Sequence, residues 1–454
     1  MKKILTSLLV LVLAVSLVAC SSKDKANGDA KNNKNNVTLK YANWNLGTEE
    51  DNNLERMMIK EFEKSHPNIK IEINESITTT DWNGTLSAAA SAGTMPDLFM
   101  IAQIPPALAN EWLMDLTDLT SKDKEFNNVP EVVRQSATFN DKVYALPFAQ
   151  HFLGYYVNKD LFNDANLDYP EYGMDVDTFT SAVKDVTNVS NSVVGINNPS
   201  AIPDWYPAAT NDKLGWFTYN DGKYELDGKE FINGIKTAQG MNSNGYAYEQ
   251  LSEDQKAKFK GEDPEQVWQQ GGIGLKWDGT WLTGEYMDKL DFEWDFVGVP
   301  GGRTVVVNDF VGISKSSKHP EEAYEFAKYM SYGKEGFMKR LEVADKEGKG
   351  LNTLPINTDE DVLQSYFDML EVPGVRLAYE NIDNGLVETV KTVPGFAASR
   401  WESPTGVAVG DKSNATMGEL IDGFMRGDLK VEDYADQLDQ LAEQKYEEAK
   451  KAIE

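Results

Sequence analysis

The chain has 454 residues, and its 73 acidic and 44 basic side chains give a formal net charge of −29 at pH 7. Such an acidic chain repels phosphate backbones, which argues against nucleic-acid binding. A body of roughly 420 residues exceeds what one hydrophobic core normally serves, so two lobes are expected. Cys20 is the only cysteine, so the chain forms no internal disulfide.

The first twenty residues predict export. A Met-Lys-Lys start precedes a mostly apolar run that ends at Cys20 and is too short for a comfortable membrane span. The segment LVAC at 17–20 resembles the bacterial lipobox, in which the cysteine thiol carries a diacylglycerol after cleavage. This resemblance predicts a signal peptide over 1–19 and a lipid anchor on Cys20. An ordinary signal peptide with an incidental cysteine remains the alternative.

Residues 20–36 follow as a polar segment with no large apolar side chain, which predicts a flexible tether. The next third alternates strands and helices. Residues 37–41 and 69–73 alternate like half-buried strands, and Leu54, Met58 and Phe62 share one helical face between them. A second helix is expected over 81–92, before an apolar run at 97–102 that suits a strand buried on both faces. This order predicts an α/β fold with a parallel sheet.

The middle third is irregular and aromatic, with a tight hairpin expected at Asp221-Gly222. Apolar stripes then recur over 320–330, 417–424 and 431–442, which indicates helices packed on a core. After the signal, no stretch is long and apolar enough to cross a membrane. Isolated histidines leave no zinc set, and neither a phosphate loop nor a nucleophile elbow occurs. The sequence therefore predicts no metal and no cofactor.

Five segments resemble, in order, motifs of the bacterial extracellular solute-binding proteins that include maltose-binding protein. They are FEKSHPNI at 62–69, AGTMPDL at 92–98, YALPF at 144–148, VNKDLF at 157–162 and GGIGLKWDGTW at 271–281. The resemblance runs from about residue 37 to the end of the chain. It implies two α/β lobes joined by crossing strands, with a ligand cleft between them. It also implies a partner, the permease subunits of an ATP-driven importer, to which the protein delivers its ligand.

By the same resemblance, the chain crosses between the lobes near 147–150, 307–310 and 351–355. One lobe is then 37–149 with 308–350, and the other is 150–307 with 351–454. Closure on a ligand requires contacts to both lobes. The expected protein is a monomer without catalytic activity, held at the outer face of the membrane by its lipid alone.

A sugar cleft combines planar polar side chains, which bind hydroxyls, with flat aromatic faces, which cover patches of C–H. Trp44 and Asn45 directly follow the first predicted strand, where the parallel-sheet rule places ligand contacts, and Glu49 lies close by in the sequence. These three residues are candidate ligand contacts. Packing in the core remains the alternative for every tryptophan.

The resemblance adds candidates in the second half of the chain. Trp281 and, on a looser match, Trp401 stand where relatives stack an aromatic side chain on the sugar. The other candidates lie beside these tryptophans or at polar contact positions of the family: Gln103, His151, Asp204, Trp205, Asp278 and Arg400. Where maltose binders tend to carry acids, positions 103 and 151 hold an amide and an imidazole, which counts against maltose itself.

Two rival functions remain open. The same fold could bind a polyol, glycerol phosphate or a peptide, although Arg400 is the only basic candidate available for an anionic ligand. A surface glycoside hydrolase would need two carboxylates held roughly 5–10 Å apart across one bond. Acid pairs are too common in this chain to exclude that arrangement by counting. The function predicted from the sequence is capture of a mono- or oligosaccharide by a lipid-anchored binding protein.

Overall fold

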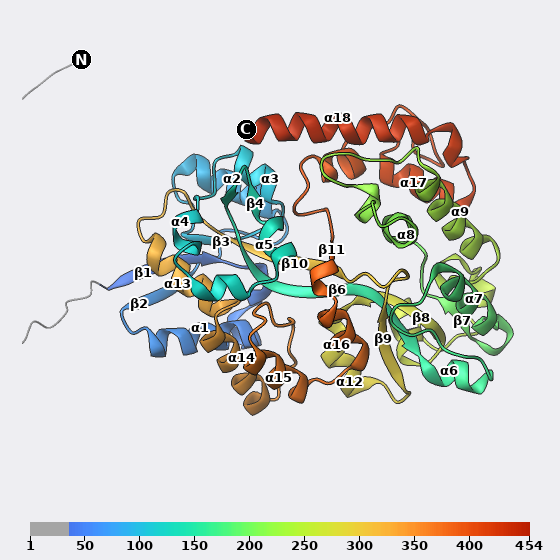
Figure 1. The fold of residues 1–454 in the computed structure, drawn as a ribbon, viewed down its shortest axis with the longest axis horizontal. Helices are drawn as coiled ribbons and strands as arrows, with labels where there is room; N and C mark the ends of the chain where they lie inside the picture. Colours follow the sequence, from blue (N-terminus) through green and yellow to red (C-terminus); the bar gives the residue numbers. More distant parts are fainter. Residues whose placement is uncertain (1–35) are drawn as a thin grey trace, which may run out of the picture. The chain divides into compact units, whose positions relative to one another are not determined.

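The computed structural model describes residues 36–454, which form one unit (Figure 1). The predicted signal peptide, Cys20 and all but the last residue of the predicted tether lie outside the described residues. No helix in the described part is long and apolar enough to cross a membrane.

The N-terminal elements confirm the predicted strand–helix–strand order. Strand β1 (Val37–Ala42) pairs in parallel with β2 (Ile69–Ile73) and with β3 (Leu98–Ile101). Helix α1 (Leu54–Ser65) lies between β1 and β2 in the chain, and α2 (Trp82–Ala92) lies between β2 and β3. Leu54, Met58 and Phe62 are buried as their spacing predicted. The apolar β3 is buried along its whole length.

The centre of the sheet is antiparallel, which the predicted parallel pattern did not anticipate. Strand β10 (Val305–Ile313) pairs antiparallel with β3 and with the 13-residue β6 (Leu146–Asn158). Strand β6 continues into antiparallel pairing with β8 (Ile273–Gly279) and β9 (Trp294–Gly298), while β7 (Val194–Ile196) pairs in parallel with β8. In Figure 1, β6 runs through the middle of the view, from the blue N-terminal elements to the green helices α6 and α7.

Three segments far apart in the sequence meet at Gln150. Gln150 lies opposite Asn308 in the β6–β10 pair, and its N–H donates to Thr353 Oγ1 at 2.9 Å. Its carbonyl accepts from the N–H of Leu354 at 2.9 Å, and its Nε2 donates to the carbonyl of Pro355 at 3.1 Å. These are the three segments at which the chain was expected to cross. The crossings themselves and the assignment of residues to two lobes remain predictions.

Helices cover the sheet, and the apolar stripes predicted from the sequence are buried. Helix α13 (Pro320–Met330) and α14 (Lys334–Glu347) pack near α1, where the nearly buried Arg340 pairs with Glu55. Helix α8 (Ile202–Thr210), α9 (Lys229–Ser243) and α17 (Met417–Arg426) pack together, and α18 (Ala435–Ile453) ends the chain beside α3 (Ile104–Ala109). The backbones of Asn220 and Lys223 pair across the turn at Asp221-Gly222, which confirms the hairpin.

The remaining elements are short. They are α4 (Thr117–Thr120), α5 (Glu131–Ser136), β4 (Thr138–Phe139), β5 (Lys142–Val143), α6 (Lys159–Asp164), α7 (Val176–Val186), α10 (Glu253–Lys256), α11 (Pro264–Gln269), α12 (Thr283–Lys289), α15 (Glu360–Met369), α16 (Pro373–Glu380) and β11 (Leu386–Val387). Strand β11 pairs in parallel with β10.

Candidate functional site

One group of candidates lies at the carboxyl ends of β1 and β3. Trp44 begins a short 3-10 turn after β1 and is half-buried, edge-on to Trp82 at 5.0 Å between ring centroids. Trp82 is not among the candidates predicted from the sequence. It is the first residue of α2, and its Nε1 donates a hydrogen bond to the carbonyl of Met100 at 2.8 Å, which fixes the ring. Asn45 is half-buried in the same turn, and Gln103 directly follows β3. Trp44, Asn45 and Gln103 thus follow the same ends of two neighbouring parallel strands, and they are called the rim below.

Glu49 is exposed in the next 3-10 turn and contacts none of the other candidates through a recorded hydrogen bond or ion pair in the described part of the chain. Its role as a ligand contact remains a prediction.

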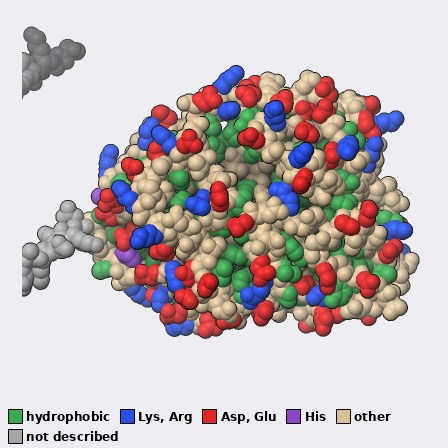
Figure 2. Space-filling model, viewed as in Figure 1, with side chains coloured by type: hydrophobic (Ala, Val, Ile, Leu, Met, Phe, Trp, Pro, Cys, Tyr) green, Lys and Arg blue, Asp and Glu red, His purple; other side chains and the backbone are tan. Residues whose placement is uncertain are grey.

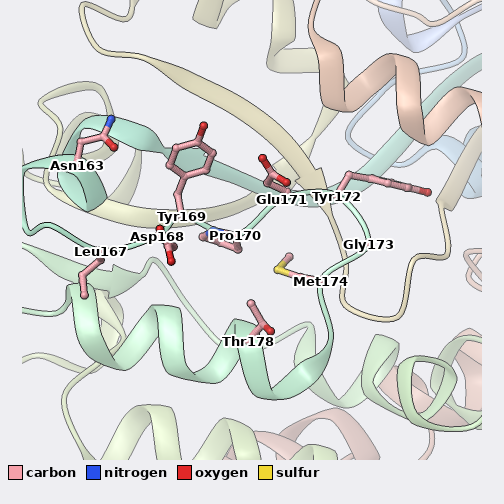
Figure 3. A pocket seen from close by; sticks show the side chains of 10 residues that line it. All are labelled: Asn163, Leu167, Asp168, Tyr169, Pro170, Glu171, Tyr172, Gly173, Met174 and Thr178. Carbon is pink, nitrogen blue, oxygen red and sulfur yellow. The ribbon is translucent and has the colours of Figure 1, made fainter.

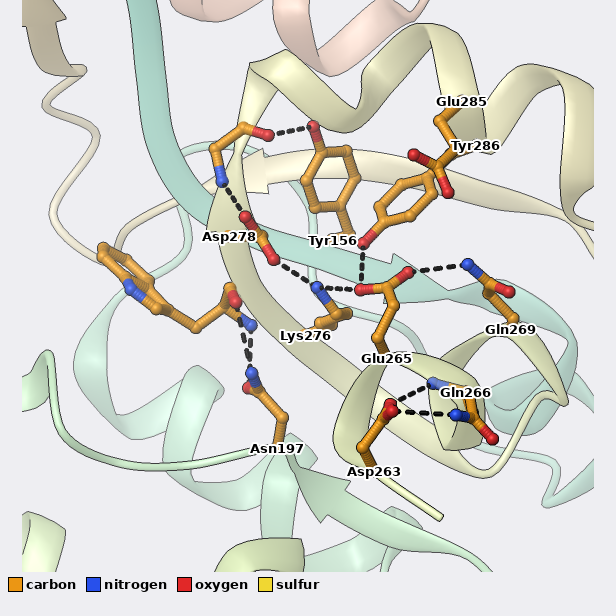
Figure 4. Close-up of polar contacts among 12 residues, drawn as sticks. Tyr156, Asn197, Asp263, Glu265, Gln266, Gln269, Lys276, Asp278, Glu285 and Tyr286 are labelled. Carbon is orange, nitrogen blue, oxygen red and sulfur yellow. Dashed lines mark hydrogen bonds and ion pairs between the residues drawn. The ribbon is translucent and has the colours of Figure 1, made fainter. Parts of the chain in front are cut away.

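A second group lies where the parallel strands β7 and β8 end. Asp278 near the end of β8 accepts from the N–H of Gly279 at 2.8 Å and pairs with the ammonium of Lys276 (Figure 4). Lys276 is only 2% exposed, and its Nζ also lies 2.8 Å from Glu265 Oε2. Asn197 after β7 accepts from the N–H of Trp277 at 2.9 Å. These strand ends border a depression of about 430 Å³, lined by Leu153, Asn197, Asn198, Asp263, Pro264, Glu265, Lys276, Trp277, Asp278 and Trp281.

Trp281 follows β8 and presents its indole to solvent. The side chain is 41% exposed, which is unusual for so large an apolar group. A Cβ at position 279 would overlap the indole of Trp281, so the ring requires glycine there. His151 in β6 packs edge-on against the same indole at 5.4 Å between centroids. The contact with His151 therefore fixes the Trp281 ring, and the exposed part of the ring remains accessible to a ligand.

His151 is buried at this position and carries no charge. Burial lowers its pKa to about 4, and Lys391 acts in the same direction while Asp309 opposes it. Its Nδ1 has no hydrogen-bond partner among the described residues. A neutral imidazole with a free nitrogen can exchange a hydrogen bond with a hydroxyl without attracting an anion.

Arg400 and Trp401 lie in a π-helical turn, Ala398–Glu402, a type of turn found often at functional sites. Arg400 binds Asp204 with two nitrogens, at 2.5 and 3.4 Å, and its guanidinium lies 4.2 Å above the ring of Phe217. Burial raises the pKa of Asp204, and Arg400 opposes that shift. Trp401 remains 48% exposed. The turn thus places a paired guanidinium beside an open indole.

Trp205 is a core residue, which corrects its assignment to the ligand site. Its side chain is 0% exposed, and its Nε1 donates to the hydroxyl of Tyr155 at 3.2 Å. The ring also packs edge-on against Phe179 at 5.4 Å. A fully buried indole offers no face to a ligand. Its neighbour Asp204 still reaches Arg400 from the same helix, α8.

Between these groups, Lys391 Nζ lies 2.5 Å from Asp309 Oδ1, and the carbonyl of Lys391 accepts from the N–H of Ile104 at 2.8 Å. This contact joins the segment after β11 to α3. A cavity of about 330 Å³ lies beside it, lined by Asn83, Gln103, Pro105, Pro106, Ala109, Val390, Val393, Gly395, Phe396, Ala397, Ala398, Glu402, Ala449 and Ala452. Figure 2 shows acidic and basic side chains mixed over one face, which is hollowed near its middle.

Another depression, of about 590 Å³, lies in the loop before α7 (Figure 3). It is lined by Asn163, Leu167, Asp168, Tyr169, Pro170, Glu171, Tyr172, Gly173, Met174 and Thr178. None of the predicted site residues borders it. Within residues 36–454, no cluster of His, Cys, Asp or Glu is arranged to hold a metal ion.

The mixed sheet, the three segments that meet at Gln150, and the polar and aromatic side chains at the strand ends define a two-lobe solute-binding protein. The chain belongs to the bacterial extracellular solute-binding protein family, whose model matches residues 46–331. It is 27% identical over 339 residues to an uncharacterised ABC transporter extracellular-binding protein of Pyrococcus horikoshii, covering 71% of this chain and 74% of that one. The resemblance read from the five motifs is confirmed.

Solved structures show the same fold. A substrate-binding protein of Listeria monocytogenes in complex with cycloalternan matches with a TM-score of 0.67 and 21% identity, covering 90% of this chain and 99% of that one. The acarbose-binding GacH receptor of Streptomyces glaucescens matches with a TM-score of 0.66 and 15% identity, covering 90% and 98%. The first is described as an ABC substrate-binding protein and the second as a receptor.

Proposed function

We propose that this protein captures a mono- or oligosaccharide between its two lobes and delivers it to an ABC importer. The observation that carries the proposal is the pair of open indoles, Trp281 and Trp401, each fixed beside polar side chains. Large aromatic rings are normally buried, and open ones with neighbouring hydrogen-bonding groups suit the two surfaces of a sugar. Solved structures with the same fold hold carbohydrate-type ligands, namely cycloalternan, acarbose and maltotetraose, and these support the same class.

The proposed contacts come from both walls. Trp44, Asn45 and Gln103 would approach the sugar from one lobe, with Glu49 at the margin. The other proposed contacts would approach it from the second lobe: His151, Asp278, Trp281, Arg400 and Trp401. Asp204 would act through Arg400 by holding its guanidinium. Ligand contact from both sides would favour the closed arrangement over the open one, which the importer would then recognise.

The charges near the site favour a neutral sugar over an anionic solute. Arg400 is paired with Asp204, Lys391 with Asp309, and Lys276 with both Glu265 and Asp278. A glycerol phosphate would have to compete with these carboxylates for each cation. The same pairing argues against a glycosidase, because Asp204 and Asp278 are both engaged by cations.

We also propose that Cys20 carries a lipid that holds the protein at the outer face of the cell membrane, with 1–19 removed as a signal peptide and 20–36 as a tether. Two acyl chains are about what stable anchoring needs. The functional unit would be a monomer.

A ligand panel tests the proposal. The shift in melting temperature would be measured with neutral mono- and oligosaccharides, glycerol phosphate, a polyol and short peptides. We expect a neutral saccharide to raise the melting temperature most, because it alone matches both open indoles. Stabilisation by glycerol phosphate or by peptides, with no response to any sugar, would replace the sugar assignment with the corresponding rival.

A further inference from the structure

Beside this site lies a carboxyl group that the contacts proposed above do not include. Glu388 directly follows β11, and its N–H donates to the carbonyl of Val306 in β10 at 3.0 Å. Val306 pairs with Val387, so the alternation of side chains puts Glu388 on the same face as Val307. Val307 in turn lies opposite His151 in β6. Glu388 therefore shares the face of the sheet that carries His151.

Glu388 lies near two ion pairs but belongs to neither. Arg400 is held by Asp204, and Lys391 by Asp309. Within residues 36–454, no ion pair includes Glu388, and its carboxylate accepts one recorded hydrogen bond, from the N–H of Val390 at 3.0 Å. Asp309 and Asp204 thus each form an ion pair, whereas Glu388 has no counter-ion of its own.

Unused polar atoms lie in the same neighbourhood. Arg400 Nε and His151 Nδ1 have no hydrogen-bond partner in the described part of the chain. Arg400 is only 8% exposed and His151 only 7%. Buried polar groups are nearly always hydrogen-bonded, so free ones beside a half-buried carboxyl point to a hydroxyl-bearing ligand at this place.

We propose that Glu388 is a ligand-binding residue, and that the site captures its sugar with a proton on this carboxyl, so that capture is coupled to the external pH. The inference rests on the proposed sugar-binding function. It adds one ligand-binding residue to that same site, and it makes sugar binding there depend on the external pH.

Sugar binding should be stronger when Glu388 is protonated, because of the charge and the water at the site. Lobe closure on a sugar removes water from the site, and an unpaired charge is costly once water is removed. A proton on Glu388 removes this unpaired charge, while Lys391 and Arg400 keep their ion pairs with Asp309 and Asp204. Closure therefore favours the protonated carboxyl, which can also donate a hydrogen bond to a sugar oxygen.

The electrostatics of the free protein agree with this direction. Burial raises the pKa of Glu388 to about 7, and Asp204 adds to the effect, while the N–H of Val390, Lys391 and Arg400 oppose it. Because the pKa in the complex is higher still, affinity is full below pH 7 and falls as the pH rises through the pKa of the bound state. Between pH 6 and pH 8 the expected loss is about tenfold.

Other titratable groups lie near Glu388, and their contributions have to be separated from its own. The pKa of His151 is lowered to about 4, so its imidazole is neutral across this range. Burial raises the pKa of Asp204, whereas its ion pair with Arg400 lowers that pKa. Asp422 on α17 also faces Arg400, and burial raises its pKa too. A variant of Glu388 itself separates these contributions.

The experiment is calorimetric titration at pH 6, 7 and 8. The probes are glucose, maltotetraose, cellotetraose and xylotetraose, and the tightest of them is carried through the series. We expect about tenfold weaker binding at pH 8 than at pH 6 for the wild type. Glu388→Gln, which mimics the protonated acid, should bind at every pH with nearly the affinity that the wild type shows at pH 6.

Asp439→Asn is the matched control, because burial raises the pKa of Asp439 on α18 to about 6 but its carboxylate accepts from the N–H of Leu226, away from the proposed contacts. This variant should keep the wild-type pH dependence of binding. A pH-independent wild-type affinity would overturn the inference and leave the sugar function intact, as would a pH dependence that persists in Glu388→Gln. Failure of all four sugars to bind even at pH 6 would count against the sugar function, and with it this inference.

Discussion

Replacing Trp281 or Trp401 with alanine separates ligand binding from folding. The two side chains are 41% and 48% exposed, so their removal opens no sealed cavity. Truncating a tryptophan that anchors a ligand commonly costs about 2 kcal/mol or more of binding free energy. At 1.4 kcal/mol per tenfold, affinity should weaken roughly 30-fold. We expect both variants to melt near the wild-type temperature without ligand and to lose most of the ligand-induced rise.

Trp205→Ala is the internal comparison. Trp205 is fully buried, and removing a buried tryptophan costs about 3–5 kcal/mol of folding stability. Its melting temperature should therefore fall both with and without sugar. Thermal melting of the three variants, with and without saturating sugar, measures both effects. If Trp281→Ala behaved like Trp205→Ala and kept its affinity, its indole would be a packing group and the stacking argument would be refuted.

Three further predictions follow from the described contacts and from the N-terminal sequence. Lys276→Met leaves Glu265 and Asp278 facing each other without a cation, so urea unfolding should show a loss of about 3 kcal/mol. The exposed pair of Lys289 with Glu285 is the control, and Lys289→Met should cost less than about 1 kcal/mol; equal losses would contradict the reasoning. Cys20→Ala should release the protein from the membrane fraction or leave an uncleaved precursor, and wild-type fractionation with normal processing would disprove the lipid anchor. Overnight incubation of stoichiometric protein with its sugar should yield no shortened product by chromatography, whereas shortened products would revive the glycosidase alternative.

The N-terminal part of the fold could be predicted because local spacing determines it. Polar–apolar alternation marks β1 and β2, and the four-residue recurrence of Leu54, Met58 and Phe62 marks α1. The central antiparallel pairing could not be read this way. Strand β6 is buried along almost its whole length, so its sequence shows no alternation that would reveal its partners. Those partners, β8 and β10, lie more than 100 residues away, and no local pattern encodes such pairing.

The site was predictable where family motifs or strand ends mark it. Trp281 and Trp44 carry such signals, and both rings retain exposed surface. The prediction that Trp205 contacts the ligand was wrong because its polar neighbours suggested a loop. Trp205 lies inside α8 and faces the core. Glu388 gave no signal, because a single acid after a two-residue strand looks like any solvated charge in so acidic a chain. Its setting arises from Lys391, which is three residues further along the chain, and from Asp204 and Arg400, which only the fold brings near it.

A crystal structure of the protein with the tightest sugar of the panel tests the central claim most directly. We expect the sugar between the lobes, stacked on Trp281 and Trp401, with at least one hydrogen bond from the rim formed by Trp44, Asn45 and Gln103. A sugar bound only in the loop depression before α7, or held by one lobe without contact to either open indole, would contradict the account.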